Sequence, residues 1–225
     1  MKKRAFTLGE VLITLTIVGV VAILVVPSFI NNIGDKSRAA SIKNTLSDLN
    51  NAVQTYMISH HIKNLSDVDL KEGEDAEFII ENLSVKRDKN DDIVRFKPPK
   101  YELLNQNQSY DNAKYGAYTS TNLYLNNGVG IAINPEKVSS DGASYYSILI
   151  DTNGEDIPNI IGIDAFEFML LTTDYEGSDQ TYYAGEFYAK LDNSSKTEDC
   201  KKGDANACSA LLIDSGYNPS YYNEN

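Results

Sequence analysis

Residues 11–34 read VLITLTIVGVVAILVVPSFINNIG and carry no charged side chain. The apolar run from Val11 to Ile30 is 20 residues long (30 − 10). A helix of this length covers about 30 Å, which is the thickness of a bilayer core. Three positive charges at residues 2–4 precede the run, and basic flanks stay on the cytoplasmic side of a membrane. The sequence therefore predicts one membrane-spanning helix, with the rest of the chain outside the cytoplasm.

Two other interpretations of this segment stay open: a cleaved secretory signal and a simple uncleaved anchor. The run is longer than the roughly 7–15 apolar residues of a secretory signal, and no small-x-small cleavage site closes it. Neither interpretation accounts for Glu10, which lies at the edge of the run. A carboxylate buried in a bilayer costs about 2.5–3.5 kcal/mol, and the helix dipole offsets only about 0.3–1 kcal/mol of that cost. An unpaired Glu10 is therefore unfavourable.

Residues 2–11 read KKRAFTLGEV. This string resembles the N-terminal signal of type IV pilins and type II secretion pseudopilins: a basic leader, a small residue, Phe-Thr-Leu, a variable position, Glu and an apolar helix. The resemblance implies that a prepilin peptidase cleaves between Ala5 and Phe6 and that Phe6 becomes N-methylated. It also implies that Glu10 pairs with the N-terminal amine of a neighbouring subunit during assembly. The chain departs from the pattern at Ala5, where glycine is usual, and at Gly9, where a bulky aliphatic residue is commoner.

The resemblance also divides the chain into a leader (1–5), a membrane half of the N-terminal helix (6–30) and a globular domain (31–225). Pro27 matches a helix-kinking proline of the family, and proline removes one backbone hydrogen bond from a helix. Beyond it the helix is expected to continue to about His60. Apolar and aromatic residues recur there at helical spacing, at positions 42, 46, 49, 53, 56 and 60, which predicts a stripe packed on the domain core.

The second half of the chain shows strand patterns. An Asn-Gly pair at 127–128 separates two alternating runs, which predicts a hairpin. Further strands are expected at 93–96, 144–150, 166–171, 182–191 and 210–213, and a short helix at 76–82. Short loops favour antiparallel pairing. The sequence thus predicts an α+β protein, and the family resemblance implies a pilin fold with the long helix packed on an antiparallel sheet.

The segment after the run at 144–150 is a candidate cation site. Asp151, Asn153, Asp156 and Asp164 offer carboxylate and amide oxygens, which suit calcium. The spacing does not match an EF-hand loop. The alternative is a turn stabilised by Asx hydrogen bonds. The surrounding string, Asp151 to Phe168, resembles a segment of bacterial pilin-like proteins, and major pseudopilins hold calcium in a C-terminal loop.

Cys200 and Cys208 are the two cysteines of the chain. The expected topology places them in the periplasm, where disulfides form. We expect a Cys200–Cys208 disulfide, which resembles the C-terminal disulfide loop of type IV pilins. A redox pair and free thiols remain alternatives.

Composition narrows the possible functions. A net charge of −12 and a pI near 4.6 provide no basic face for nucleic acid. No catalytic motif is evident, so an enzyme is not expected, and no cofactor is required. The resemblance implies a structural subunit of a type IV pilus or a secretion pseudopilus. Its partners are the prepilin peptidase, other pilin subunits and the inner membrane, with the C-terminal domain periplasmic and later in the fibre. An adhesive or receptor-binding tip subunit on the same anchor is the alternative.

Overall fold

The computed structural model describes residues 7–67, 76–104, 122–138, 142–177, 180–189 and 196–218, without the side chains of 24–33, 67 and 135–138. The chain divides into two compact units, Met1–Ser37 and Arg38–Asn225. Helix α1 (Leu8–Ser59) supplies residues to both units. The sequence-based division instead placed the end of the membrane half at residue 30.

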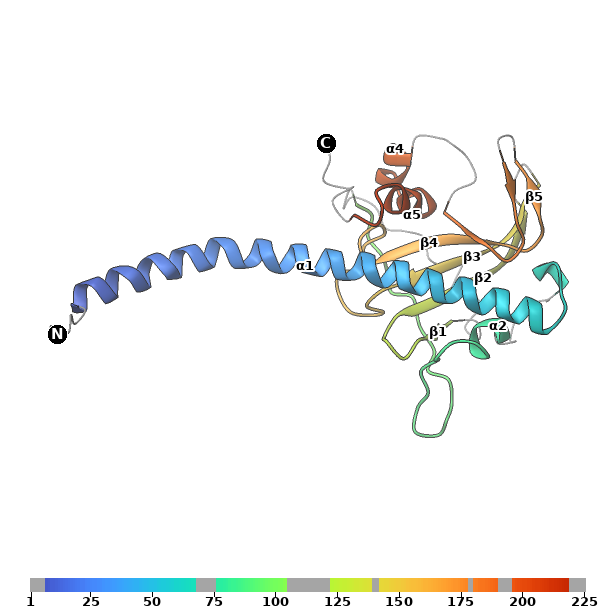
Figure 1. The fold of residues 1–225 in the computed structure, drawn as a ribbon, viewed down its shortest axis with the longest axis horizontal. Helices are drawn as coiled ribbons and strands as arrows, with labels where there is room; N and C mark the ends of the chain where they lie inside the picture. Colours follow the sequence, from blue (N-terminus) through green and yellow to red (C-terminus); the bar gives the residue numbers. More distant parts are fainter. Residues whose placement is uncertain are drawn as a thin grey trace, which may run out of the picture. The chain divides into compact units, whose positions relative to one another are not determined.

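The part of α1 within the second unit packs one stripe into the core. Ile42, Leu46, Leu49, Val53 and Tyr56 are all buried, which confirms the predicted stripe. Their partners include apolar residues of three strands, and Figure 1 shows this part of α1 running across β2, β3 and β4. The position at 60, which was expected to end the stripe, follows the last helical residue and is exposed.

A five-stranded antiparallel sheet forms the centre of the second unit, in the order β1-β2-β3-β4-β7. The strands are β1 (Leu123–Tyr124), β2 (Gly130–Val138), β3 (Ser144–Asp151), β4 (Ala165–Leu171) and β7 (Phe187–Tyr188). A separate two-stranded sheet consists of β5 (Tyr175–Glu176) and β6 (Thr181–Tyr182). The described helices besides α1 are η1 (Leu65–Asp67), α2 (Glu77–Ile80), α4 (Lys196–Lys201) and α5 (Ala205–Asp214). The α+β class predicted from the sequence is confirmed.

The Asn-Gly turn lies where the sequence predicted it. Leu123 pairs with Ile131 across the hairpin, and the backbone N–H of Gly128 donates to the carbonyl of Leu125 at 3.0 Å. Gly128 has φ +90, a conformation that favours glycine because side chains with a Cβ are strained there. The turn therefore sets the register of the sheet's first two strands.

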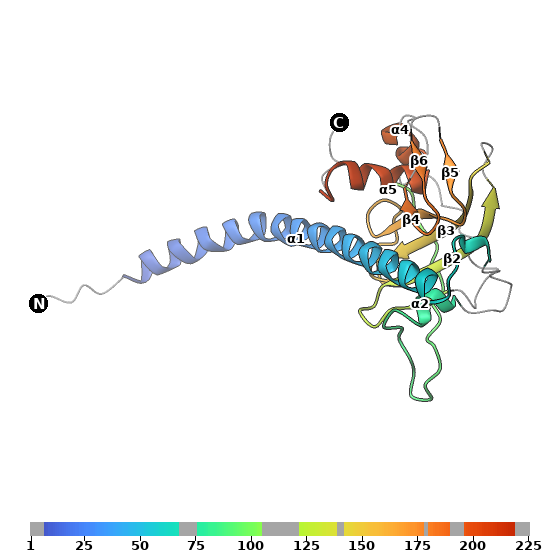
Figure 2. The same ribbon diagram turned by 45° about the vertical axis from the view of Figure 1, so that its right-hand side comes forward.

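Alternate residues of the central strands point into two different cores. Ile148, Ile150 and Phe168 belong to the core that contains the α1 stripe. Leu149 and Ala165 belong to a second core, together with residues of α4 and α5. Figure 2 shows α5 close to β4, and α4 packs against α5. Because successive side chains of a strand point to opposite faces, one face of the sheet contributes to each core.

Three strand predictions differ from the structure. The segment 210–213, predicted as a strand, lies inside α5, because Asp204 caps the helix and the alanine-rich sequence favours helix. The segment 182–191 contains β6 and β7, two short strands, in place of one long one. Residues 93–96 form one isolated bridge, Arg87↔Ile93. The Val94 carbonyl accepts from the N–H of Tyr124 in β1, and the Phe96 N–H donates to the carbonyl of Asn122, just before β1. The predicted helix near residue 79 is present as α2.

Candidate functional site

The start of α1 is closed by a reciprocal pair of hydrogen bonds between Thr7 and Glu10. The Glu10 carboxylate accepts from the Thr7 backbone N–H at 2.8 Å and from the Thr7 hydroxyl at 2.9 Å. The Glu10 N–H donates to the Thr7 hydroxyl oxygen at 3.3 Å. This is a capping box, and the spacing Thr-x-x-Glu is its sequence signature, which our sequence analysis missed. Ala5 and Phe6, the predicted cleavage site, lie outside the described residues.

The next turns of α1 expose an apolar surface. Ten large apolar side chains between Leu8 and Ile23 are exposed, from 42% at Val11 to 80% at Leu8. The hydroxyls of Thr14 and Thr16 donate to the carbonyls of Val11 and Leu12 in the same helix. Both threonines thus satisfy their donors without an outside partner.

Over the residues that the structure describes, no helix combines the length and the apolar character needed to span a membrane. Pro27 lies inside α1, but its side chain is not among those that the structure describes. The predicted kink there stays a prediction.

In the second unit, Asp151 organises the loop that follows β3. Its Oδ1 accepts from the backbone N–H groups of Asn153 at 3.1 Å and Gly154 at 2.8 Å. Its Oδ2 accepts from the hydroxyl of Tyr101 at 2.5 Å. Asp151 is fully buried. These bonds form the Asx-stabilised turn that the sequence offered as the alternative to calcium, and Asp151 is its centre.

Asp164 closes the same loop from its other end. Its Oδ1 accepts from the N–H of Ile160 at 2.8 Å, and its backbone carbonyl accepts from the N–H and hydroxyl of Thr152 at 2.9 and 3.1 Å. Asp164 is also fully buried. The loop therefore has two buried carboxyl groups, one at each end.

Burial sets the protonation of both carboxyl groups. Desolvation raises the pKa of Asp151 to about 6, although the bonds from Tyr101, Asn153 and Gly154 favour the charged form. Desolvation, with the nearby charge of Asp151, raises the pKa of Asp164 to about 7, and Arg38 offsets part of that increase. Raised carboxyl pKa values in a buried pair indicate that the charged form is poorly compensated.

The four predicted calcium ligands divide into two groups. Asn153 and Asp164 each have a buried side-chain oxygen that no hydrogen-bond donor reaches within the described part of the chain, which fits a cation. Asp156 is exposed, and both oxygens of Asp151 already accept hydrogen bonds. No group of three or more His, Cys, Asp or Glu side chains suited to a metal occurs among the described residues. The original four-residue set therefore fits calcium only in part.

Removing the Tyr101 hydroxyl tests the role of Asp151 as the centre of the turn. Tyr101 is fully buried, so Tyr101→Phe leaves the Asp151 Oδ2 without its donor. An unsatisfied buried acceptor costs about 1–3 kcal/mol. We expect the free energy of unfolding, measured by urea titration at neutral pH, to fall by that amount. A matched control is Tyr183→Phe on an exposed tyrosine, which should change it by less than about 0.5 kcal/mol.

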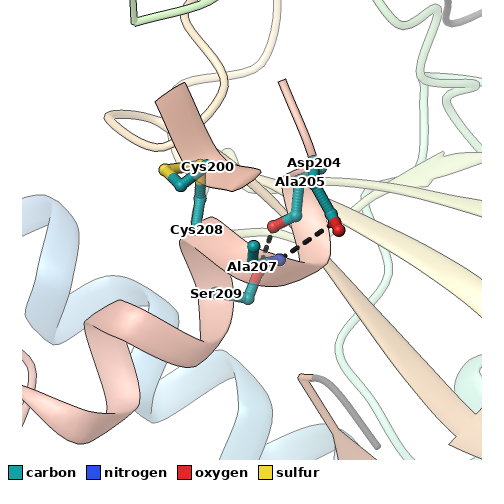
Figure 3. The surroundings of a disulfide bond; sticks show 6 residues. All are labelled: Cys200, Asp204, Ala205, Ala207, Cys208 and Ser209. Atoms are coloured by element: carbon teal, nitrogen blue, oxygen red, sulfur yellow. Dashed lines mark hydrogen bonds between the residues drawn. A yellow bond between two sulfur atoms is a disulfide. The ribbon is translucent and has the colours of Figure 1, made fainter. Parts of the chain in front are cut away.

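The predicted disulfide is present between Cys200 of α4 and Cys208 of α5. Figure 3 shows the bond next to the first turn of α5, where the Asp204 carboxylate accepts from the Ala207 N–H at 3.0 Å. Both cysteines are buried. The bond therefore joins two helices whose connecting turn is only a few residues long.

The disulfide also touches the Asp151–Asp164 loop. A Cβ added at Gly162, which has φ +91, would meet the Cys208 Sγ at 3.1 Å and the Leu104 Cδ1 at 3.2 Å. Glycine is therefore favoured at this position, because its positive φ strains other residues and an added Cβ would be crowded. Ile161 of the loop and the two cysteines belong to the same buried cluster.

No protein-family model, curated protein or solved structure matches this chain.

Proposed function

We propose that this chain is a structural subunit, a pilin-like protein or pseudopilin. It assembles by helix bundling into a type IV pilus or a type II secretion pseudopilus. Assembly follows cleavage by a prepilin peptidase between Ala5 and Phe6 and N-methylation of Phe6. The observation that carries this proposal is the exposed apolar surface of α1 between Leu8 and Ile23.

An exposed apolar surface of this kind is unfavourable in water unless lipid or protein buries it. Apolar side chains lie on all sides of this stretch of helix, with Glu10 at its start, and such helices occur in membranes or in the interior of assemblies. Thr14 and Thr16 bond to their own helix, so these two side chains add no unsatisfied donors to an apolar environment. Lipid is the proposed cover before assembly, and the helices of other subunits are the cover in the fibre.

The second unit is consistent with the role of an outer domain. An amphipathic helix packed on an antiparallel sheet is the arrangement that the family resemblance implies, and the Cys200–Cys208 bond suits an oxidising compartment. The proposed location is the inner membrane, with this unit in the periplasm until the subunit enters the fibre. The proposed partners are the peptidase, the membrane and other subunits.

Replacing Glu10 tests the assembly role directly. Glu10→Gln keeps a side chain that can complete the capping box with Thr7, but it removes the charge. We expect Glu10→Gln and Glu10→Ala to reduce the amount of subunit in sheared fibres by about tenfold or more, because the charged partner on the next subunit is left uncompensated.

The matched control is Glu198→Ala, in the first turn of α4. It removes another exposed first-turn carboxylate and should leave fibre incorporation unchanged. Full incorporation of Glu10→Gln would contradict the pairing role. Separately, N-terminal sequencing of the mature protein should find N-methylated Phe6, and an intact Met1 would contradict the proposal as a whole.

An adhesive tip subunit on the same anchor is the second candidate. The observation that favours it is Tyr183, which is 54% exposed beside a tyrosine cluster of residues 175, 182 and 188. Among the described tyrosines only Tyr183 is exposed, so the other described tyrosine rings pack wholly or partly within the fold. The structural role therefore comes first.

A further inference from the structure

A pocket of about 450 Å³ lies in the second unit, where α1, β4, β7 and the residues after α5 meet. A volume of this size is typical of small-molecule sites. Every residue that lines the pocket belongs to Arg38–Asn225, so one unit forms it alone. The residues of the β3–β4 loop and of the disulfide are not among them, so this pocket is separate from the acidic loop described above.

The inner surface of the pocket is apolar. Leu46 of α1 and Phe168 of β4 are buried residues of the core that contains the α1 stripe. The half-buried rings of Phe187 and Tyr217 pack against the same core. All four side chains line the pocket. Because apolar and aromatic groups gain free energy when they are buried against such a surface, the pocket suits a ligand with an apolar body.

Polar groups of α1 line the same pocket. Lys43, Ser47 and Asn50 lie at positions i, i+4 and i+7, so they share one face of the helix. The Lys43 Nζ lies 5.6 Å from the centroid of the Tyr217 ring, a cation–π contact that keeps the ammonium group at the wall of the pocket. An anionic group bound here would meet a positive charge together with hydroxyl and amide donors.

A carboxylate on another segment adds the opposite charge. Glu186 directly precedes β7 and lines the pocket, and its Oε2 accepts from the Tyr188 hydroxyl at 2.6 Å, which orients the carboxylate. Within the part of the chain that the structure describes, no ion pair joins Lys43 to Glu186. Two opposite charges that line one pocket without pairing are complementary to a ligand that carries both charges.

We propose that this pocket binds a small zwitterion with an apolar body, an amino acid or a short peptide. The carboxylate of the ligand pairs with Lys43, its ammonium group pairs with Glu186, and its side chains lie against Phe168 and Phe187. Charge-assisted hydrogen bonds are about twice as strong as neutral ones, so both charged groups of the ligand contribute to affinity. The proposal does not depend on whether the chain enters a fibre.

Isothermal titration calorimetry of the full chain in detergent tests the ligand class, with L-phenylalanyl-L-leucine and free L-phenylalanine as probes. We expect a Kd of about 0.1–1 mM. Tighter binding of the dipeptide identifies a peptide as the ligand, and equal or tighter binding of phenylalanine identifies a free amino acid. The N-acetylated and C-amidated forms of the tighter probe each lack one charge and should bind about three- to tenfold more weakly. Binding of neither probe, or equal binding of the parent and both blocked forms, would overturn the proposal.

Two variants assign the charged partners. Lys43→Met keeps an apolar stem and should weaken the parent probe by about three- to tenfold, while the affinity for its C-amidated form stays unchanged. Glu186→Gln should do the same for the parent probe and spare the N-acetylated form. Lys63→Met, at an exposed lysine outside the pocket, is the control and should bind like the wild type. Lys43 is also exposed, so its variant keeps the test decisive if Glu186→Gln does not fold. Wild-type affinity in Lys43→Met, or an equal loss in Lys63→Met, would overturn the assignment.

Discussion

In EDTA, the free energy of unfolding of the wild-type chain should fall between pH 5 and pH 8. This fall should exceed that of Asp164→Asn by on the order of 3 kcal/mol. Burial raises the pKa of Asp164 to about 7 in the folded state, whereas an unfolded aspartate titrates near 3.9. Between these values the folded state binds more protons than the unfolded state, so stability falls as the pH rises. The contribution is fully present below about pH 4 and is lost as the pH passes through 7.

The measurement is urea unfolding of both proteins at pH 5 and pH 8. The asparagine variant keeps the shape of the side chain and removes the titration, so the difference between the two proteins isolates Asp164. Asp156→Asn serves as the control, because that carboxylate is exposed and its replacement should preserve the wild-type pH dependence. Equal pH dependence in wild type and Asp164→Asn would contradict the expectation.

The second large effect is expected from the disulfide. Replacing both Cys200 and Cys208 with serine should lower the free energy of unfolding by about 2–5 kcal/mol. The bond closes a loop with a sequence separation of 8 residues, and the chain-entropy model assigns about 2–3 kcal/mol to a loop of this size. The two buried serine hydroxyls that replace the bond add a further cost unless they find partners.

Urea unfolding under non-reducing conditions compares this variant with the wild type. Wild-type protein that is unfolded and refolded in reductant should approach the variant, because the same cross-link is missing. An unchanged unfolding midpoint and slope in the double variant would contradict the prediction.

Much of the sheet could be predicted from the sequence because its signals are local. The Asn-Gly pair at 127–128 marks a turn, and β3 and β4 are short apolar runs with strand-forming residues. The run at 210–213 is also apolar, and its periodicity alone does not distinguish a strand from a helix. The N-cap Asp204 and the alanines that follow it indicate a helix, and the strand prediction did not take them into account.

The loop site could be predicted only in part. The spacing of acidic and amide residues identified the segment, but it does not show which oxygens accept hydrogen bonds within the fold. Tyr101 is separated from Asp151 by 50 residues, and no local pattern connects them. Burial decides the protonation state of Asp164. That burial depends on the segment at 101–104 and the disulfide, which pack around the loop. Such contacts arise from the tertiary structure.

The packing of α1 on the sheet has a consequence for the order of events during synthesis. Ser59 ends the helix, and Phe168, one of the residues that cover its stripe, comes 109 residues later (168 − 59). At about 5–20 residues per second, roughly 5–20 s pass before that cover exists. Throughout this interval the stripe of the newly made helix has only part of its cover from its own chain, because β4 is still missing, so we expect a membrane surface or a chaperone to keep it out of aggregates.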